Sequence, residues 1–193
     1  MRVLPVVAPA GPEHAADLAY ALATVGLAGV EVRAEGVAKL RATIGALLDA
    51  APGLLVGAGL LGRAEQVHQA VAAGADFVAT PAVDDEVIRC AHGLGASVLP
   101  VLGGYPDAIA AARESAPVVR LEVPDPERGL ETVRRYARLF PRLHLVPSGP
   151  IGADDAGGYL GHPAVAAVAT TRLQDAGDVG AFAQVARAHP APG

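Results

Sequence analysis

The sequence contains little of what several common functions require. Tryptophan is absent, and there are only four tyrosines and three phenylalanines. No basic cluster is interleaved with these aromatics, so the stacking platforms of nucleic-acid-binding proteins are missing. No apolar run approaches the roughly 20 residues that a membrane helix needs. The single cysteine, Cys90, excludes an intramolecular disulfide and is typical of a reducing compartment. We therefore expect a cytoplasmic protein that binds neither nucleic acid nor membrane.

The composition that remains is that of a globular protein. Of the 193 residues, 52% are hydrophobic and 18% charged, and the formal net charge is -5. A chain of this length can bury a large core, and no shift in composition marks a linker. We expect one domain that spans residues 1–193.

Short apolar runs alternate with longer segments of helical periodicity along the whole chain. The pattern predicts eight strands, at residues 3–7, 29–33, 54–57, 76–80, 97–101, 117–123, 143–147 and 165–169. A helix is expected after each strand: 13–25, a second that ends near 48, 63–73, one opened by Asp84 and Asp85, 106–114, 127–140, 153–160 and 178–188.

Eight strand–helix units predict an α/β protein with a compact (β/α)8 TIM barrel. Near-continuous apolar strands such as LLVGAG and SVLPVL are typical of parallel strands covered by helices. The alternative is an open doubly wound sheet, but no GxGxxG follows the first strand, and Gly57-Ala58-Gly59 after the third strand is weak evidence for it.

Charged residues interrupt two of the apolar strands. Glu31 and Arg33 are two residues apart on the second strand, and Arg120 and Glu122 are two apart on the sixth. Residues with this spacing point to the same face of a strand. Because charges are rarely buried without partners, the four side chains predict one enclosed polar site.

In a barrel of this kind the chemistry lies at the carboxyl ends of the strands. Most of the units contribute a polar or small residue there. Besides the four charged residues, the candidate binding residues are Gly57, Thr80, Pro81, Ser148, Gly149, Thr170, Thr171 and Arg172.

The chain contains, in order, VLPVV, GVEVR, LLVGAG, ADFVATPA, SVLPVLGG, VVRLEVP and LHLVPSGPI. This order resembles the 2-keto-3-deoxy-6-phosphogluconate (KDPG) and 4-hydroxy-2-oxoglutarate (KHG) aldolases, from about Val3 to Arg187. The resemblance implies a (β/α)8 barrel, a homotrimer, a lyase reaction on a 2-keto acid in carbohydrate metabolism, and no cofactor. It also implies a Schiff-base lysine on the sixth strand and an acid/base glutamate on the second.

The match to the family's functional residues is partial. Glu31 occupies the place of the glutamate, but Arg120 occupies that of the lysine. Where the family has an arginine for the substrate carboxylate the chain has Glu35, and the nearest arginine is Arg33. The phosphate-binding glycines are reduced to 148–150, and Pro150 has no N–H to offer; Arg172 either compensates or is a plain surface residue.

These departures decide which chemistry is possible. A Schiff base needs a neutral primary amine, and arginine stays protonated at any useful pH. The chain has one lysine, Lys39, which we expect on the surface of the second helix. The family's covalent mechanism is therefore not expected here.

Three functional hypotheses remain. The first is a lyase or proton-transfer enzyme acting on a small 2-keto acid, with Glu31 and Arg120 as catalytic residues and Arg33 as an anchor for the anion. The second is a non-catalytic relative that binds a small anion or serves an assembly role, its site filled by Arg120–Glu31 and Arg33–Glu122 ion pairs. The third is a metal-dependent lyase, which the histidine spacing does not support, so we expect no metal site.

Overall fold

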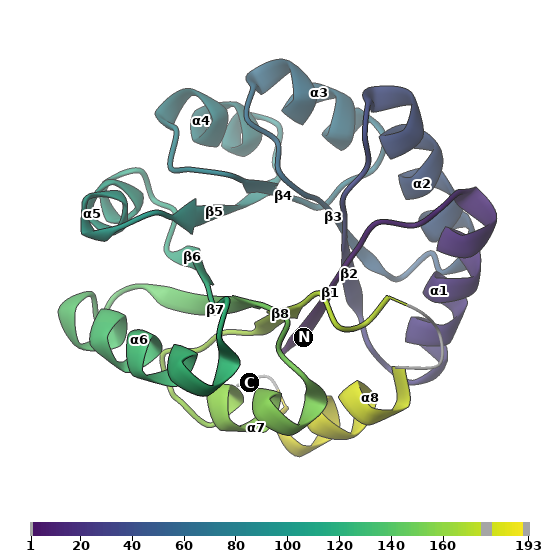
Figure 1. Ribbon diagram of the computed structural model, residues 1–193. Coiled ribbons are helices and arrows are strands. Elements are labelled where there is room, and N and C mark those ends of the chain that lie inside the picture. The colour runs from purple at the N-terminus through teal and green to yellow at the C-terminus, as the bar shows by residue number, and fades with distance from the viewer. Residues whose placement is uncertain (1, 175–178, 191–193) are drawn as a thin grey trace.

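The computed structural model describes residues 2–174 and 179–190. Within them, eight parallel strands close into a barrel in the order β1 to β8, and the helices surround it as a ring (Figure 1). The strands are β1 Val3–Val7, β2 Gly29–Val32, β3 Leu55–Ala58, β4 Phe77–Thr80, β5 Ser97–Leu102, β6 Val118–Glu122, β7 His144–Gly149 and β8 Val168–Thr170. The helices are α1 Pro12–Thr24, α2 Val37–Ala50, α3 Ala64–Ala72, α4 Asp85–Gly93, α5 Tyr105–Arg113, α6 Pro126–Leu139, α7 Ala153–Leu160 and α8 Val179–Ala188.

The predicted (β/α)8 barrel is confirmed, and the open doubly wound sheet is excluded. β8 pairs with β1 and closes the sheet, with Val3 opposite Val168 and Pro5 opposite Thr170. The expected helix start at Asp84 is also confirmed, because its carboxylate accepts hydrogen bonds from the backbone N–H groups of Glu86 and Val87, each at 3.0 Å.

The eighth strand is the element that differs most from its prediction. It was expected at residues 165–169, but Val165 makes only an isolated bridge to Leu145. The Arg2 guanidinium donates to the backbone carbonyls of Val165 and Ala166. Side-chain hydrogen bonds thus occupy carbonyls that a longer strand would offer to β1.

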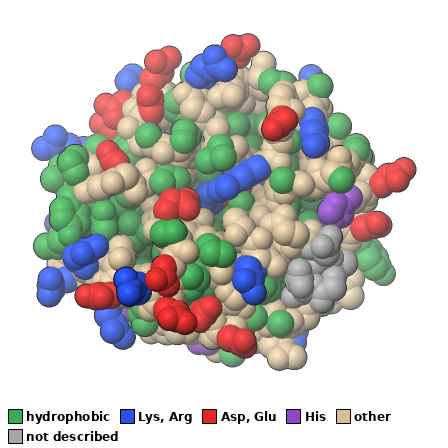
Figure 2. Space-filling view, viewed as in Figure 1, with side chains coloured by type: hydrophobic (Ala, Val, Ile, Leu, Met, Phe, Trp, Pro, Cys, Tyr) green, Lys and Arg blue, Asp and Glu red, His purple; other side chains and the backbone are tan. Residues whose placement is uncertain are grey.

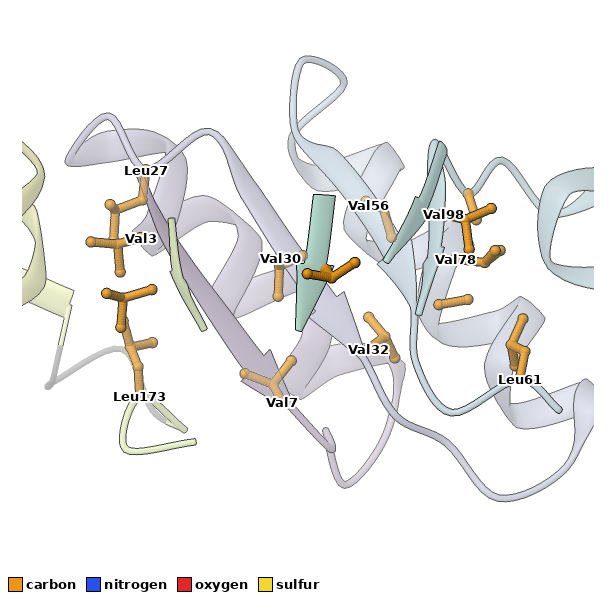
Figure 3. Packing of buried hydrophobic residues seen from close by; sticks show 14 of the residues in the cluster. Val3, Val7, Leu27, Val30, Val32, Val56, Leu61, Val78, Val98 and Leu173 are labelled. Atoms are coloured by element: carbon orange, nitrogen blue, oxygen red, sulfur yellow. The ribbon is translucent and has the colours of Figure 1, made fainter. Parts of the chain in front are cut away.

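Alternate strand residues form two separate apolar clusters. The larger cluster lies between strands and helices and includes Val7, Val30, Val32 and Val56 (Figure 3). The smaller one lies inside the barrel and consists of Leu4, Val6, Ala79, Leu99, Val146 and Ala169. Residues that alternate with the larger cluster therefore point into the barrel.

Candidate active site

Glu31 of β2 and Arg120 of β6 meet inside the barrel, and both side chains are fully buried. Nη1 of Arg120 donates to Oε1 of Glu31 at 3.1 Å, and Nη2 donates to Oε2. Two parallel charge-assisted bonds of this kind fix the orientation of both groups. Two of the four charged side chains that the sequence predicts in one enclosed polar site therefore meet inside the barrel, as a bidentate ion pair.

The alternation of the strands places this pair inside. Val30 and Val32 flank Glu31 and belong to the outer cluster, as do Val119 and Leu121 on either side of Arg120. Glu31 lies opposite Val6 in the sheet register and Arg120 opposite Val146, both residues of the inner cluster. The ion pair is thus held among apolar side chains, where water screens it little.

Arg33 approaches the same carboxylate from the carboxyl end of β2. Its Nε donates to Oε1 of Glu31 at 3.3 Å, and its side chain is 30% exposed. Two guanidiniums thus share one carboxylate, which gives the three side chains a formal net charge of +1. This positive charge favours the binding of an additional anion.

Two further polar groups are buried at or near the ion pair. Nε of Arg120 is buried and has no hydrogen-bond partner among the residues that the structure describes. Ser148 is also buried, at an inward position of β7 next to Glu122 of β6 in the register. Such donors suit an acceptor oxygen.

One predicted ion pair is wrong. Arg33 pairs with Glu31, and in the described part of the chain Glu122 makes no ion pair and is exposed. The reason is its position: Glu122 is the last residue of β6, one inward position beyond Arg120, where the barrel opens to water. It lies at the rim and not in the enclosed cluster.

The glycines at the candidate site leave room for different neighbouring groups. A side chain at Gly57 would clash with the ring of Phe77, and one at Gly149 would clash with the backbone oxygen of Val123. Gly59, the last residue of the Gly57-Ala58-Gly59 segment, is the glycine that borders the ion pair: a Cβ there would clash with Oε1 of Glu31 and lie 3.0 Å from Cγ of Arg33. The absence of a side chain at Gly59 therefore leaves room for the carboxylate.

Two of the predicted binding residues use their hydroxyls to hold loops. Oγ1 of Thr80 donates to the backbone oxygen of Ala82 at 2.7 Å, and Oγ1 of Thr170 donates to that of Ile151 at 2.6 Å. Thr80 and Thr170 alternate with inner-cluster residues Ala79 and Ala169, so strand alternation alone indicates that they face away from the interior. The remaining candidates lie nearer the surface, where Thr171 is half-buried and Pro81 and Arg172 are exposed.

Gln174 is a residue of this region that sequence reasoning missed. Its amide Nε2 donates to the backbone oxygens of Val6 at 3.0 Å and Thr171 at 2.7 Å. It thereby joins the segment after β8 to β1, the strand beside Glu31. A single glutamine after a strand carries no sequence signal for such a role.

Basic and acidic side chains lie around the edge of the face seen in Figure 2, with a few over its centre. The chain's one lysine, Lys39, lies exposed on α2, outside the barrel.

Within residues 2–174 and 179–190, no three His, Cys, Asp or Glu side chains are grouped as metal ligands. His144 is exposed at the start of β7, at the end of the barrel opposite Ser148. In the same residues no helix is long and apolar enough to cross a membrane.

Comparisons with known proteins agree with this architecture. The family model described as KDPG and KHG aldolase matches residues 1–188. A 2-dehydro-3-deoxy-phosphogluconate aldolase from Treponema pallidum is 30% identical over 187 residues, which cover 96% of this chain and 89% of the relative. A crystal structure of a 4-hydroxy-2-oxoglutarate/2-dehydro-3-deoxyphosphogluconate aldolase from TTHB1 superposes with a TM-score of 0.84 at 27% identity, covering 97% of this chain and 93% of that one. A crystal structure of a 2-keto-3-deoxy-6-phosphogluconate aldolase from Zymomonas mobilis also has a TM-score of 0.84, at 25% identity, and the match covers 98% of this chain and 94% of that one. The chain belongs to the KDPG and KHG aldolase family.

Proposed function

We propose that the protein is a lyase or proton-transfer enzyme that acts on a small 2-keto acid without forming an imine. The observation that carries this proposal is the position of Glu31, a buried carboxylate held between two guanidiniums whose combined charge exceeds its own. Family membership supports a 2-keto acid as the class of substrate.

The absence of an imine follows from the side chains that face the interior. The resemblance puts Arg120 where the family has its lysine, and a guanidinium is not a nucleophilic amine. Lys39 lies on the outer face of the ring, on α2, and is exposed. Arg120 therefore contributes charge and hydrogen bonds, and no covalent bond.

The remaining groups suffice for proton transfer next to a carbonyl. A 2-keto acid brings a carboxylate that Arg33 and Arg120 attract, and the same charges stabilise the enolate that forms when the neighbouring carbon loses a proton. Glu31 is the carboxylate placed to accept that proton. The Ser148 hydroxyl, at an inward position of β7, is a further donor for the ligand.

A second function is favoured by a different observation. Both oxygens of Glu31 already accept hydrogen bonds from Arg120, and both side chains are fully buried. Such a pair fills the interior and fixes the fold without any ligand. We propose as the alternative a non-catalytic relative that binds a small anion or serves an assembly role.

A turnover assay distinguishes the enzyme from the non-catalytic relative. The purified protein, with and without added divalent metal, is incubated with pyruvate, 4-hydroxy-2-oxoglutarate and KDPG in deuterated water, and NMR follows both cleavage and exchange of the hydrogens next to the keto group. The first function predicts exchange or cleavage that Glu31→Gln abolishes and Glu131→Gln retains, because Glu131 is an exposed carboxylate on α6, outside the barrel interior. A folded protein that is inactive with all three compounds would count heavily against the first function.

The proposal also covers assembly, metabolic role and location. Family likeness supports a homotrimer that acts in carbohydrate metabolism, and the single cysteine supports a cytoplasmic location. Sedimentation velocity at two protein concentrations tests the trimer.

A further inference from the structure

Arg120 has more hydrogen-bonding capacity than Glu31 uses. Its two terminal nitrogens donate to the carboxylate, and its Nε, also buried, donates to no residue that the structure describes. A buried donor without an acceptor is unfavourable. The guanidinium is therefore incompletely satisfied in the ion pair.

The charge of the cluster is also incompletely balanced. Glu31 carries the one negative charge against Arg33 and Arg120, which leaves a formal +1 among buried and half-buried groups. One carboxylate from outside would balance it. Arg33, 30% exposed, connects the buried pair with the open end of the barrel.

Glu31 is the group that would have to move if such an anion reached Arg120. Its carboxylate occupies both terminal nitrogens of Arg120, so a second carboxylate cannot bind them in the same bidentate manner. Arg33 offers Glu31 an alternative partner, because its Nε already lies 3.3 Å from Oε1. Glu31 can therefore leave one guanidinium without losing the other.

We propose that the carboxylate of the ligand displaces Glu31 from Arg120, so that Glu31, still paired with Arg33, is released from Arg120 to accept a proton only when the ligand is bound. This exchange rests on the proposed function, because it takes a small 2-keto acid as the ligand. No covalent bond forms or breaks: Arg120 changes its partner from Glu31 to the ligand, and Glu31 keeps Arg33. In the free protein Glu31 acts as an internal competitor for the ligand's binding site, which lowers the apparent affinity.

The exchange predicts that removing the competitor tightens binding. Isothermal titration calorimetry with pyruvate as the probe compares the wild type with Glu31→Gln and Glu131→Gln. We expect Glu31→Gln to bind pyruvate about tenfold more tightly or better, since the ligand then gains a charge-assisted contact without losing one. Glu131→Gln removes the same charge from an exposed position on α6, and we expect its affinity to stay within about twofold of the wild type.

A second variant covers the case in which Glu31→Gln does not fold, because it leaves Arg120 buried without a counter-charge. Arg120→Met keeps the pair of Glu31 with Arg33 and removes the proposed anion receptor. We expect its affinity for pyruvate to fall about tenfold or more. Unchanged binding in Arg120→Met, or binding in folded Glu31→Gln that is no tighter than in Glu131→Gln, would overturn the exchange.

The titrations test the exchange and the NMR assay tests the proposed catalysis, so either hypothesis can be refuted without the other. Tighter binding in Glu31→Gln without turnover in the wild type would support the exchange and refute the proposed catalysis. Turnover in the wild type with no gain in affinity in Glu31→Gln would do the opposite. If pyruvate binds to none of the proteins, the exchange is wrong, and the NMR assay alone decides the function.

Discussion

Arg120 and Glu31 form a bidentate ion pair in the barrel interior, and neither side chain reaches solvent. The pair joins β6 to β2 across the barrel, so it links strands that are not neighbours in the sheet. Because the pair is buried, losing one partner should strongly destabilise the fold: water cannot reach the remaining charge and replace the lost partner.

Removing one member of the pair should be costly. We expect Glu31→Gln to lower the free energy of unfolding by about 3–5 kcal/mol, since the Arg120 charge stays buried and unpaired. Glu35→Gln changes the same chemistry at an exposed site and should stay within about 0.5 kcal/mol of the wild type. Urea denaturation followed by circular dichroism measures both.

Removing both members should cost far less than the sum of the single changes. The double variant Glu31→Leu with Arg120→Met replaces the pair by apolar side chains and should lie within about 2 kcal/mol of the wild type. Additive losses in this double-mutant cycle would show that the two side chains do not act as a pair.

An amine at position 120 should restore the capacity to form an imine. The wild type should give no covalent adduct with pyruvate and borohydride, because its interior presents a guanidinium and its one lysine lies exposed on α2. In Arg120→Lys, mass spectrometry should detect one reduced pyruvate on the chain, mapped to position 120. Adduct formation on the wild type would contradict the proposed function, and Lys39→Arg would show whether Lys39 is responsible.

Gly59 should tolerate no side chain. A Cβ there would clash with Oε1 of Glu31 and approach Cγ of Arg33 to 3.0 Å, so in Gly59→Ala either the carboxylate or the backbone at residue 59 must shift. We expect a loss of about 1–3 kcal/mol in thermal or urea unfolding. Gly62→Ala is the matched control, because its Cβ would meet nothing closer than Cγ of Pro81, at 3.7 Å. Equal stability of the two variants would mean that the carboxylate can move without cost.

The sequence predicts the barrel well because each strand is a short apolar run and each helix is amphipathic. The ion pair of Glu31 with Arg120 was also predictable, since both residues alternate with valines or leucines that must face the helices. The same alternation would have placed Thr80 and Thr170 away from the interior, where their hydroxyls bind loop backbone. A position at the end of a strand does not by itself place a side chain in the barrel interior.

Other features depend on distances across the barrel that a sequence pattern does not contain. Arg33 prefers Glu31 to Glu122 because β6 ends at Glu122, in water. Gln174 binds the carbonyl of Val6, which is 168 positions away in the chain. The clash that fixes Gly59 likewise comes from a neighbouring strand and not from a turn.

The titration of the Tyr159 phenol should lower the stability of the fold at high pH. It lies buried on α7 and donates its hydroxyl hydrogen bond to the backbone oxygen of Pro126, at the start of α6. Burial, with smaller contributions from Asp155 and Asp125, raises the pKa of Tyr159 from 10.0 to about 12. Between these values the unfolded chain releases the phenolic proton and the folded chain keeps it, so this group's contribution to stability is complete below pH 10 and is lost as the pH rises toward 12.

We expect Tyr159→Phe to be about 1 kcal/mol less stable than the wild type at neutral pH, because it lacks the hydrogen bond to Pro126. Its free energy of unfolding should fall less steeply than that of the wild type above pH 10, since the titrating group is gone. Tyr20→Phe, at a side chain that is 70% exposed, should follow the wild-type curve. Urea titrations at closely spaced pH values measure the slopes, and parallel curves for Tyr159→Phe and the wild type would show that the phenol does not stabilise the fold through its buried proton.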